Sequence, residues 1–482
     1  MQDFIFRISP NIVLGSYTVS RLGIQALEWG SRYMVIIDPI LNEVKMQEKI
    51  ISALVDRKLD HFIFSELTEG TSTKTIQRAL ALAKESHVQG IIAVGGAKAL
   101  NIGRCVAALY NEVHDFYTFV DGALPTTSPI SCICVPTTFR TPFVFTNEIP
   151  VTDSRNHQLK LMKVQNNLTK LVVIDPNLML TLTDNQKSSI SMEVLSMGIE
   201  AYLSQKANFF SDMFVEKGLE LLSYALDGSP SLDITTPEEI LLAQAGAMIS
   251  LATSSSSLGL CSLLGLTINS RYKIDKSLVS SILLAYSVED AAQFKAARLE
   301  KIAHIMRIAP EETTGEEAIK MFVDYIRQKI AKFNLPARLK DLQLSIEQLS
   351  LATSSSSLGL CSLLGLTINS RYKIDKSLVS SILLSYAVED AAQFKAARLE
   401  KLAHIMRAVP EDITGEEAIK MFVDYIRQKI AKFNLPARLK DLQLSIEQLS
   451  LAVEDVRPVD IINNLPRSMT TDDIFDFVKN AY

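Results

Sequence analysis

The chain contains one hundred-residue segment twice in tandem, at residues 251–350 and 351–450. Removing one copy from the 482 residues leaves a unit of 382. Solenoid proteins stack short units of about 20 to 50 residues, so two long copies after 250 unrepeated residues do not predict a solenoid. The repetition is compatible with natural slippage and with an engineered duplication. The positions that differ between the copies are Ala285/Ser385, Ser287/Ala387, Ile302/Leu402, Ile308/Ala408, Ala309/Val409, Glu312/Asp412 and Thr313/Ile413.

The composition is that of a globular protein, with 48% hydrophobic residues, 21% charged residues and a net charge of −5. No run of five Lys or Arg residues occurs, so binding of nucleic acid through bulk charge is not expected. The most apolar stretch, 258–268, is about half the length of a membrane-spanning helix. The N-terminus has no secretion pattern. We therefore expect a cytoplasmic protein with neither membrane nor nucleic acid as a partner.

Short β-branched runs alternate with helical patterns over about the first 180 residues. Such alternation predicts a parallel sheet covered by helices on both faces. From residue 183 onward the apolar residues recur at helical spacing almost without interruption. The sequence therefore predicts α/β plus all-α architecture: a Rossmann-like domain at 1–178, followed by a helical domain at 179–482 that is enlarged by the two copies.

Five segments, in this order along the chain, resemble the iron-containing alcohol dehydrogenase family, which is related to glycerol dehydrogenase and dehydroquinate synthase. The resemblance covers the whole single-copy unit and implies the family's fold, with a nucleotide site in the first domain and a metal site in the second. The segments are IIDP (36–39), AVGGAKALNIGR (93–104), VPTTFRTPFVFT (135–146), VVIDPNLMLTLT (172–183) and SMEVLSMGIEAYLSQKAN (191–208).

The positions of the family's metal ligands hold other residues in this chain. The resemblance implies an aspartate and a histidine four residues apart on one helix, where Glu193 and Met197 stand. It also implies two histidines fourteen residues apart, where Ser262 and Lys276 stand, and a further histidine between them, where Leu266 stands. Iron and zinc prefer imidazole nitrogen and carboxylate oxygen. We therefore predict no metal ligands, no bound iron or zinc, and an ion pair between Lys276 and Glu193.

The loop that contacts the cofactor in the family carries larger side chains in this chain. Phe139, Arg140, Pro142 and Phe143 stand where the family pattern has alanine, glycine, glycine and serine. Such side chains are expected to fill ligand space, and Pro142 also lacks a backbone N–H. We therefore expect no cofactor, or NAD(P) bound at most weakly.

Some residues still match the cofactor-binding pattern. Asp38 matches the family's ribose-binding aspartate. Lys98 opposes the helix dipole at the start of a helix, so with Arg140 it fits either a bound anion or a solvated surface. The predicted cofactor-binding residues are Asp38, Gly95, Gly96, Lys98, Thr137, Thr138 and Arg140.

Two functional hypotheses follow, and the sequence does not settle whether the chain is an enzyme. The first is a pseudoenzyme with the dehydrogenase fold, without catalytic residues, that has lost metal-dependent hydride transfer and acts as a scaffold, assembly or regulatory binding protein. The alternative is an NAD(P)-dependent alcohol oxidoreductase with a rebuilt, metal-free site that uses Glu193 and Lys276.

The duplication implies an apolar surface that one domain cannot cover alone. We expect copy one to continue the helix at 243–250 and dock in the native position, and copy two to form an appended bundle. We expect residues 451–482 to return and complete the helical domain. We also expect a homo-oligomer, formed through the duplicated segment.

Overall fold

The computed structural model describes residues 10–229, 235–342, 376–406, 408–410, 412–433, 435–454 and 471–482, together with residues 361, 364, 368, 372 and 374. The chain forms two compact units, Met1–Ala352 and Thr353–Tyr482. The first contains the sheet and copy one, and the second contains copy two and the C-terminal segment.

A six-stranded parallel sheet lies at the centre of the first unit, in the order β1-β8-β5-β4-β2-β3. The inner strands are rich in Val and Ile and buried on both faces, as expected where helices cover a parallel sheet. An antiparallel hairpin of β6 and β7 stands apart from this sheet. The strands are β1 (Asn11–Leu14), β2 (Arg32–Ile37), β3 (Asp60–Phe64), β4 (Gly90–Gly95), β5 (Ser131–Pro136), β6 (Glu148–Asp153), β7 (Gln158–Lys163) and β8 (Thr169–Ile174).

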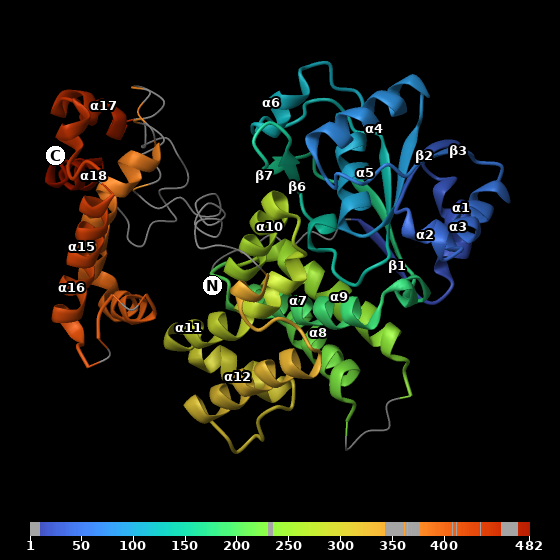
Figure 1. Ribbon diagram of the computed structural model, residues 1–482. Helices are drawn as coiled ribbons and strands as arrows, with labels where there is room; N and C mark the ends of the chain where they lie inside the picture. Colours follow the sequence, from blue (N-terminus) through green and yellow to red (C-terminus); the bar gives the residue numbers. More distant parts are fainter. Residues whose placement is uncertain are drawn as a thin grey trace. The chain divides into compact units, whose positions relative to one another are not determined.

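Helices cover both faces of this sheet, as Figure 1 shows, with α1 to α3 on one face and α4 and α5 on the other. Alternate residues of β2 enter opposite cores: Val35 contributes to the first and Met34 to the second. The helices of this region are α1 (Leu22–Ala26), α2 (Ile40–Glu43), α3 (Met46–Val55), α4 (Thr73–Glu85), α5 (Ala97–Leu109) and α6 (Phe116–Val120). The predicted parallel-sheet domain is confirmed, although β1 at the sheet edge was not predicted.

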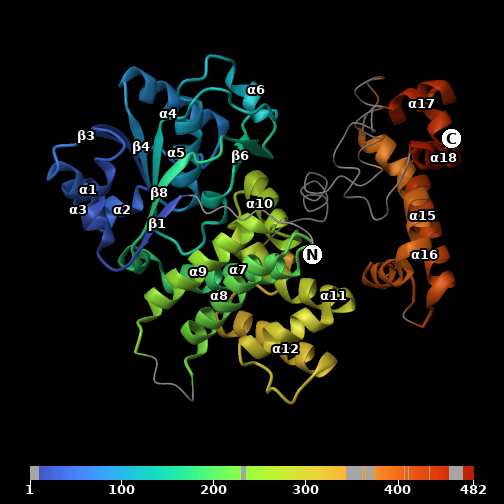
Figure 2. The same cartoon turned by 180° about the vertical axis from the view of Figure 1, so that it is seen from behind.

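The rest of the first unit is a helical bundle in which α7, α8 and α9 pack side by side (Figure 2). The predicted all-helical region is thus confirmed. Helix α9 ends at Ser255, within the serine run at 254–257, and it meets α10 at a bend of 98°. These helices are α7 (Asp184–Leu203), α8 (Phe209–Asp227), α9 (Glu238–Ser255), α10 (Leu260–Tyr272), α11 (Lys276–Ile305) and α12 (Gly315–Lys332).

No single described helix is long and apolar enough to cross a bilayer, although α9 and α10 together meet that test by length and composition.

The second unit repeats the folding of copy one. Its helices α15 (Lys376–Ile405) and α16 (Gly415–Lys432) match α11 and α12, and α15 has the same break at Lys395 that α11 has at Lys295. The C-terminal helices α17 (Ile446–Glu454) and α18 (Thr471–Asn480) share a hydrophobic cluster with copy two. The described part of 451–482 therefore packs on copy two, and the expectation that it completes the first helical domain is wrong.

The same side chains have different environments in the two copies. In copy one, α11 packs against α7 and α8, so Leu284 and Met306 are only 1% and 3% exposed. Their counterparts, Leu384 on α15 and Met406 directly after it, are 46% and 48% exposed. The face of copy two that carries Leu384 and Met406 is therefore exposed in the second unit, whereas the matching face of copy one is buried.

Candidate functional site

Five of the predicted cofactor residues lie together at the carboxyl ends of adjacent strands. Asp38 follows β2, Gly95 and Gly96 close β4, and Thr137 and Thr138 follow β5. The amide of Thr137 donates to the Gly95 carbonyl at 3.1 Å, and the amide of Asp38 donates to the Val94 carbonyl at 3.0 Å. This edge of an open parallel sheet is where ligands of such folds bind.

Gly95 has a structural reason to be glycine. Its φ is +147°, and a Cβ at this position would lie 2.8 Å from the Cβ of Asp38. The following Gly96 is the N-cap of α5 and provides no side-chain cap. The first amide groups of this helix therefore point toward the sheet edge without a side-chain acceptor, which is the arrangement that binds phosphate groups.

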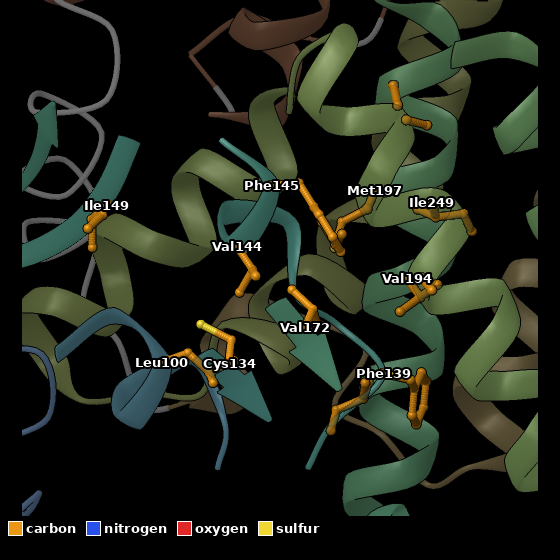
Figure 3. Close-up of a cluster of buried hydrophobic side chains, with 14 of the residues drawn as sticks. Leu100, Cys134, Phe139, Val144, Phe145, Ile149, Val172, Val194, Met197 and Ile249 are labelled. Carbon is orange, nitrogen blue, oxygen red and sulfur yellow. The ribbon is translucent and has the colours of Figure 1, made fainter. Parts of the chain in front are cut away.

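The bulky loop after β5 packs differently from the sequence expectation. Phe139 is 2% exposed and lies among the buried side chains of Figure 3. Its carbonyl lies against α9, where a Cβ on Gly246 would come within 1.7 Å of it. The buried guanidinium of Arg104 donates to the carbonyls of Phe143 at 2.6 Å and Thr146 at 2.5 Å, which fixes the loop. Phe139 therefore fills the core between the sheet domain and α9 rather than ligand space.

A buried cluster of charges occupies the place where the family pattern has its metal. Glu193, on α7, is 3% exposed and pairs with the Lys276 Nζ at 2.7 Å, as predicted from the sequence. Its other oxygen accepts from the guanidinium of Arg140. Arg140 also lies 3.5 Å from Asp275 and donates to the hydroxyl of Ser277. Two cations and two carboxylates thus balance one another.

The pKa values follow from this pairing. Burial raises the pKa of the Glu193 carboxyl, but the charges of Arg140 and Lys276 outweigh it and leave the net pKa below the usual value. The pKa of Asp275 is lowered to about 2, because Arg140 and the hydrogen bonds from Ser277 outweigh burial. Burial lowers the pKa of Lys276, and Glu193 opposes that shift only in part. Glu193 is therefore an anion at neutral pH.

This donor set does not fit a divalent metal. Lys276 and Arg140 would repel a cation, and they already occupy the oxygens of Glu193. The buried Met197 offers only a thioether, within the hydrophobic cluster of Figure 3. Among the described residues, no group of three His, Cys, Asp or Glu side chains is placed to hold an ion.

A second buried carboxylate, Glu200, was not recognised in the sequence. It lies seven residues after Glu193 on α7 and accepts hydrogen bonds from the hydroxyl and the amide of Ser262. Burial raises its pKa, and these hydrogen bonds only partly oppose the rise. The seven-residue spacing, two helical turns, was a signal that both glutamates face the same way. Ser262, at a family ligand position, thus serves a neighbouring glutamate.

A cavity of about 260 Å³ lies between the start of α5 and the α10–α11 junction. Lys98 lines it from the predicted cofactor side, and Leu266 and Lys276 line it from the family's metal-ligand positions. Phe143 also borders it. The structure therefore brings Lys98 to this cavity, whereas Arg140 faces Glu193 and Asp275.

The models of one protein family match almost the entire chain. The family model described as "Iron-containing alcohol dehydrogenase" matches residues 9–176. The description "Fe-containing alcohol dehydrogenase family, C-terminal" matches twice, at 188–355 and at 350–482. The chain belongs to the iron-containing alcohol dehydrogenase family. The second match of the C-terminal model falls on copy two and the C-terminal segment.

Relatives with known names are distant. The NAD-dependent methanol dehydrogenase of Bacillus methanolicus is 22% identical over 74% of this chain and 94% of its own length. The lactaldehyde reductase of Escherichia coli K12 is 22% identical over 64% of this chain and 81% of its own length. The sulfoacetaldehyde reductase of Bifidobacterium kashiwanohense, solved in complex with NAD⁺, has a TM-score of 0.64 at 15% identity and covers 74% of this chain and 93% of its own. The structural likeness establishes the fold.

The expectation of no cofactor, with NAD(P) weak and iron and zinc absent, is contradicted by these comparisons. The family is described as iron-containing, the B. methanolicus relative is NAD-dependent, and the B. kashiwanohense structure holds NAD⁺. The prediction about NAD(P) was wrong because it placed the side chain of Phe139 in the ligand space. In the structure Phe139 is buried in the core. For iron, the correction rests on the description of the family, and it stands beside a donor set in this chain that does not fit a divalent ion.

Proposed function

We propose that this member of the family binds NAD(P) at the carboxyl edge of its sheet, has lost metal-assisted hydride transfer, and acts as a regulatory binding protein in the cytoplasm. The observation that carries the second part is the pairing of Glu193 with both Lys276 and Arg140. A Lewis acid contributes several kcal/mol to such a reaction by polarising the substrate oxygen. In this cluster the oxygens of Glu193 are held by cations.

The nucleotide part rests on the sheet edge. Gly95 and Gly96 allow close approach of a phosphate, the uncapped start of α5 can donate to it, and Asp38 stands at the position of the family's ribose-binding aspartate. Asp38 is half-buried, and among the residues that the structure describes its carboxylate accepts one weak hydrogen bond, from the Ile40 amide at 3.4 Å. Its carboxylate therefore keeps acceptor capacity for ribose hydroxyls.

Titration of the purified full chain with NADH, followed by the fluorescence of the nicotinamide, tests this part. We expect binding in wild type and about tenfold weaker binding in Asp38→Ala, since a hydrogen bond to a charged group contributes about 1.5–3 kcal/mol. Asp56→Ala, an exposed aspartate at the end of α3, is the control and should bind as wild type does. Equal affinity of wild type and Asp38→Ala would refute this nucleotide site.

One observation favours a second candidate, a metal-free oxidoreductase. Lys276 lines the cavity while pairing with Glu193, so its ammonium can donate a hydrogen bond to a carbonyl oxygen placed there. This candidate predicts slow reduction of small aldehydes by NADH in wild type, and none in Lys276→Met. Turnover that is unchanged in Lys276→Met would exclude it.

A further inference from the structure

We propose that the exposed face of α15, in copy two, binds an amphipathic helix of a partner protein that carries two acidic residues about one turn apart beside an apolar stripe. The face consists of Arg398, Lys401 and Leu402 in the second half of α15, together with Met406 directly after it. It lies in the second unit, so it includes neither the nucleotide site nor the buried charge cluster of the first unit. Copy one carries the same face and shows which kind of helix covers it.

The face of copy two is apolar at its centre and open. Leu402 and Met406 are 43% and 48% exposed, and their spacing of four residues places them on one side of the helix. Arg398 and Lys401 are exposed beside them. Elsewhere α15 is covered, because it lies along α16 (Figure 1) and Ala403 is buried in a hydrophobic cluster with that helix. Grouped apolar side chains with a charged border are typical of an interaction surface.

In copy one the charged residues of this face pair with α8. The guanidinium of Arg298 donates to Asp212 at 2.6 Å, and the ammonium of Lys301 donates to Glu216 at 2.5 Å. Asp212 and Glu216 are four residues apart, so both carboxylates project from one side of α8. The partner of the basic residues is therefore a helix with an acidic pair at this spacing.

The apolar residues of copy one are buried in the same region. Ile302 is fully buried and Met306 is 3% exposed. Both belong to one hydrophobic cluster with Val215 and Leu219 of α8, which are also fully buried. Each of these two residues of α8 stands three positions after one member of the acidic pair. The apolar stripe of α8 thus runs beside its acidic pair.

The two copies differ at one position of this face, where Ile302 of copy one corresponds to Leu402 of copy two. Both are aliphatic side chains of similar volume. Copy two therefore keeps the charges and the apolar area that fit α8, whereas the α8 of the first unit is already covered by copy one. Another helix of the same chemistry would bury Leu402 and Met406 and place an acidic side chain beside Lys401, and these contacts favour binding.

A peptide of residues 208–228, which contains α8 and both of its capping residues, is the probe. Titration of the labelled peptide with the purified full chain, followed by fluorescence anisotropy, should show saturable binding. Met406→Ser should weaken this binding about tenfold or more, because most of an apolar side chain that becomes buried is removed. Lys401→Glu should weaken it about fivefold, because an ion pair at the border is replaced by repulsion.

A second peptide, with Glu216→Lys, distinguishes direct contact from a general effect of charge. It should bind wild type about fivefold more weakly than the first peptide does, for the same reason. It should recover that loss on the Lys401→Glu chain, because the exchanged charges restore the pair. Absence of this recovery would show that Lys401 does not face the acidic pair, and would overturn the proposal.

Lys301→Glu is the matched control, since it is the same change on the face that copy one already uses within the first unit. It should leave peptide binding within about twofold of wild type. A loss in Lys301→Glu as large as that in Lys401→Glu would overturn the proposal, and so would the absence of saturable binding. A full chain that self-associates through the same face and takes up no peptide would assign the face to a second copy of the chain, which also overturns the proposal.

Discussion

Neutralising Glu193 should destabilise the first unit strongly, because two buried cations depend on its charge. Lys276 and Arg140 have side chains only 12% and 13% exposed, so Glu193→Gln leaves both with little water to replace the carboxylate. Removing one partner from a buried ion pair costs about 3–5 kcal/mol. We therefore expect Glu193→Gln to lower the unfolding free energy at pH 7 by about that amount.

The pH dependence has a definite sign. The pKa of Glu193 is lower in the folded state than its unfolded value of about 4.3, so its contribution is complete above that value. The contribution is lost as the pH falls through the folded pKa. The difference in stability between wild type and Glu193→Gln should thus be constant near neutral pH and shrink in acid.

Glu200→Gln is the matched control, on the same helix and face. Burial raises the pKa of Glu200, so this group stabilises the fold below its unfolded pKa, and that contribution is lost as the pH rises through the folded pKa. Removing its charge should leave stability at pH 7 unchanged or increased. Trp29, the single tryptophan of the chain, lies in the sheet domain, so its fluorescence in urea reports on the first unit. Equal stabilities of the two variants at pH 7 would refute this account of the cluster.

Two further predictions use the repeated segment. Leu284→Ala should cost about 2–5 kcal/mol of unfolding free energy, whereas Leu384→Ala, the same change where the side chain is 46% exposed, should cost within about 0.5 kcal/mol. Far-UV circular dichroism in urea, which reports on the helices of both units, measures the two changes, and equal effects would contradict the burial difference between the copies. We also expect the full chain to self-associate through the exposed face of α15. Deletion of 351–450 should then reduce the molar mass measured by light scattering to that of a monomer. A full chain that is itself monomeric would contradict this expectation.

The sheet could be predicted because its evidence is local. The strand of Tyr33–Ile37 and that of Gly90–Gly95 are continuous apolar runs ending in turn residues, which is typical of buried parallel strands. The edge strand β1, only four residues long, has a mixed pattern of exposure and no comparable signal. The end of α9 could not be predicted either, because a run of four serines is compatible both with a closely packed helix and with a bend.

The candidate site was predicted in part. The pairing of Lys276 with Glu193 followed from opposite charges at positions that the family pattern brings together. The third member, Arg140, was assigned to the cofactor side, because sequence does not show which way a loop arginine points. The direction of Phe139 was misjudged for the same reason, since the space for it is created by Gly246, more than a hundred residues later in the chain. Long-range packing of this kind leaves no local pattern.

The behaviour of copy two shows a further limit. Within the first unit α7 and α8 pack against α11 and Leu284 is buried, whereas Leu384 on α15 of the second unit is 46% exposed. The C-terminal helices α17 and α18 then pack on the copy that directly precedes them. The sequence of the repeated segment therefore does not by itself predict which of its side chains are buried.

The loss of metal-assisted hydride transfer is tested most directly by steady-state turnover. The purified full chain, incubated with Fe²⁺ or Zn²⁺ under anaerobic conditions, would be assayed with NAD⁺ and small alcohols, including methanol, beside the NAD-dependent methanol dehydrogenase of B. methanolicus, prepared in the same way. Our account predicts no metal-dependent formation of NADH by this chain while the relative turns over. Metal-dependent turnover that rises with the amount of metal added, and falls when a chelator removes it, would contradict the account.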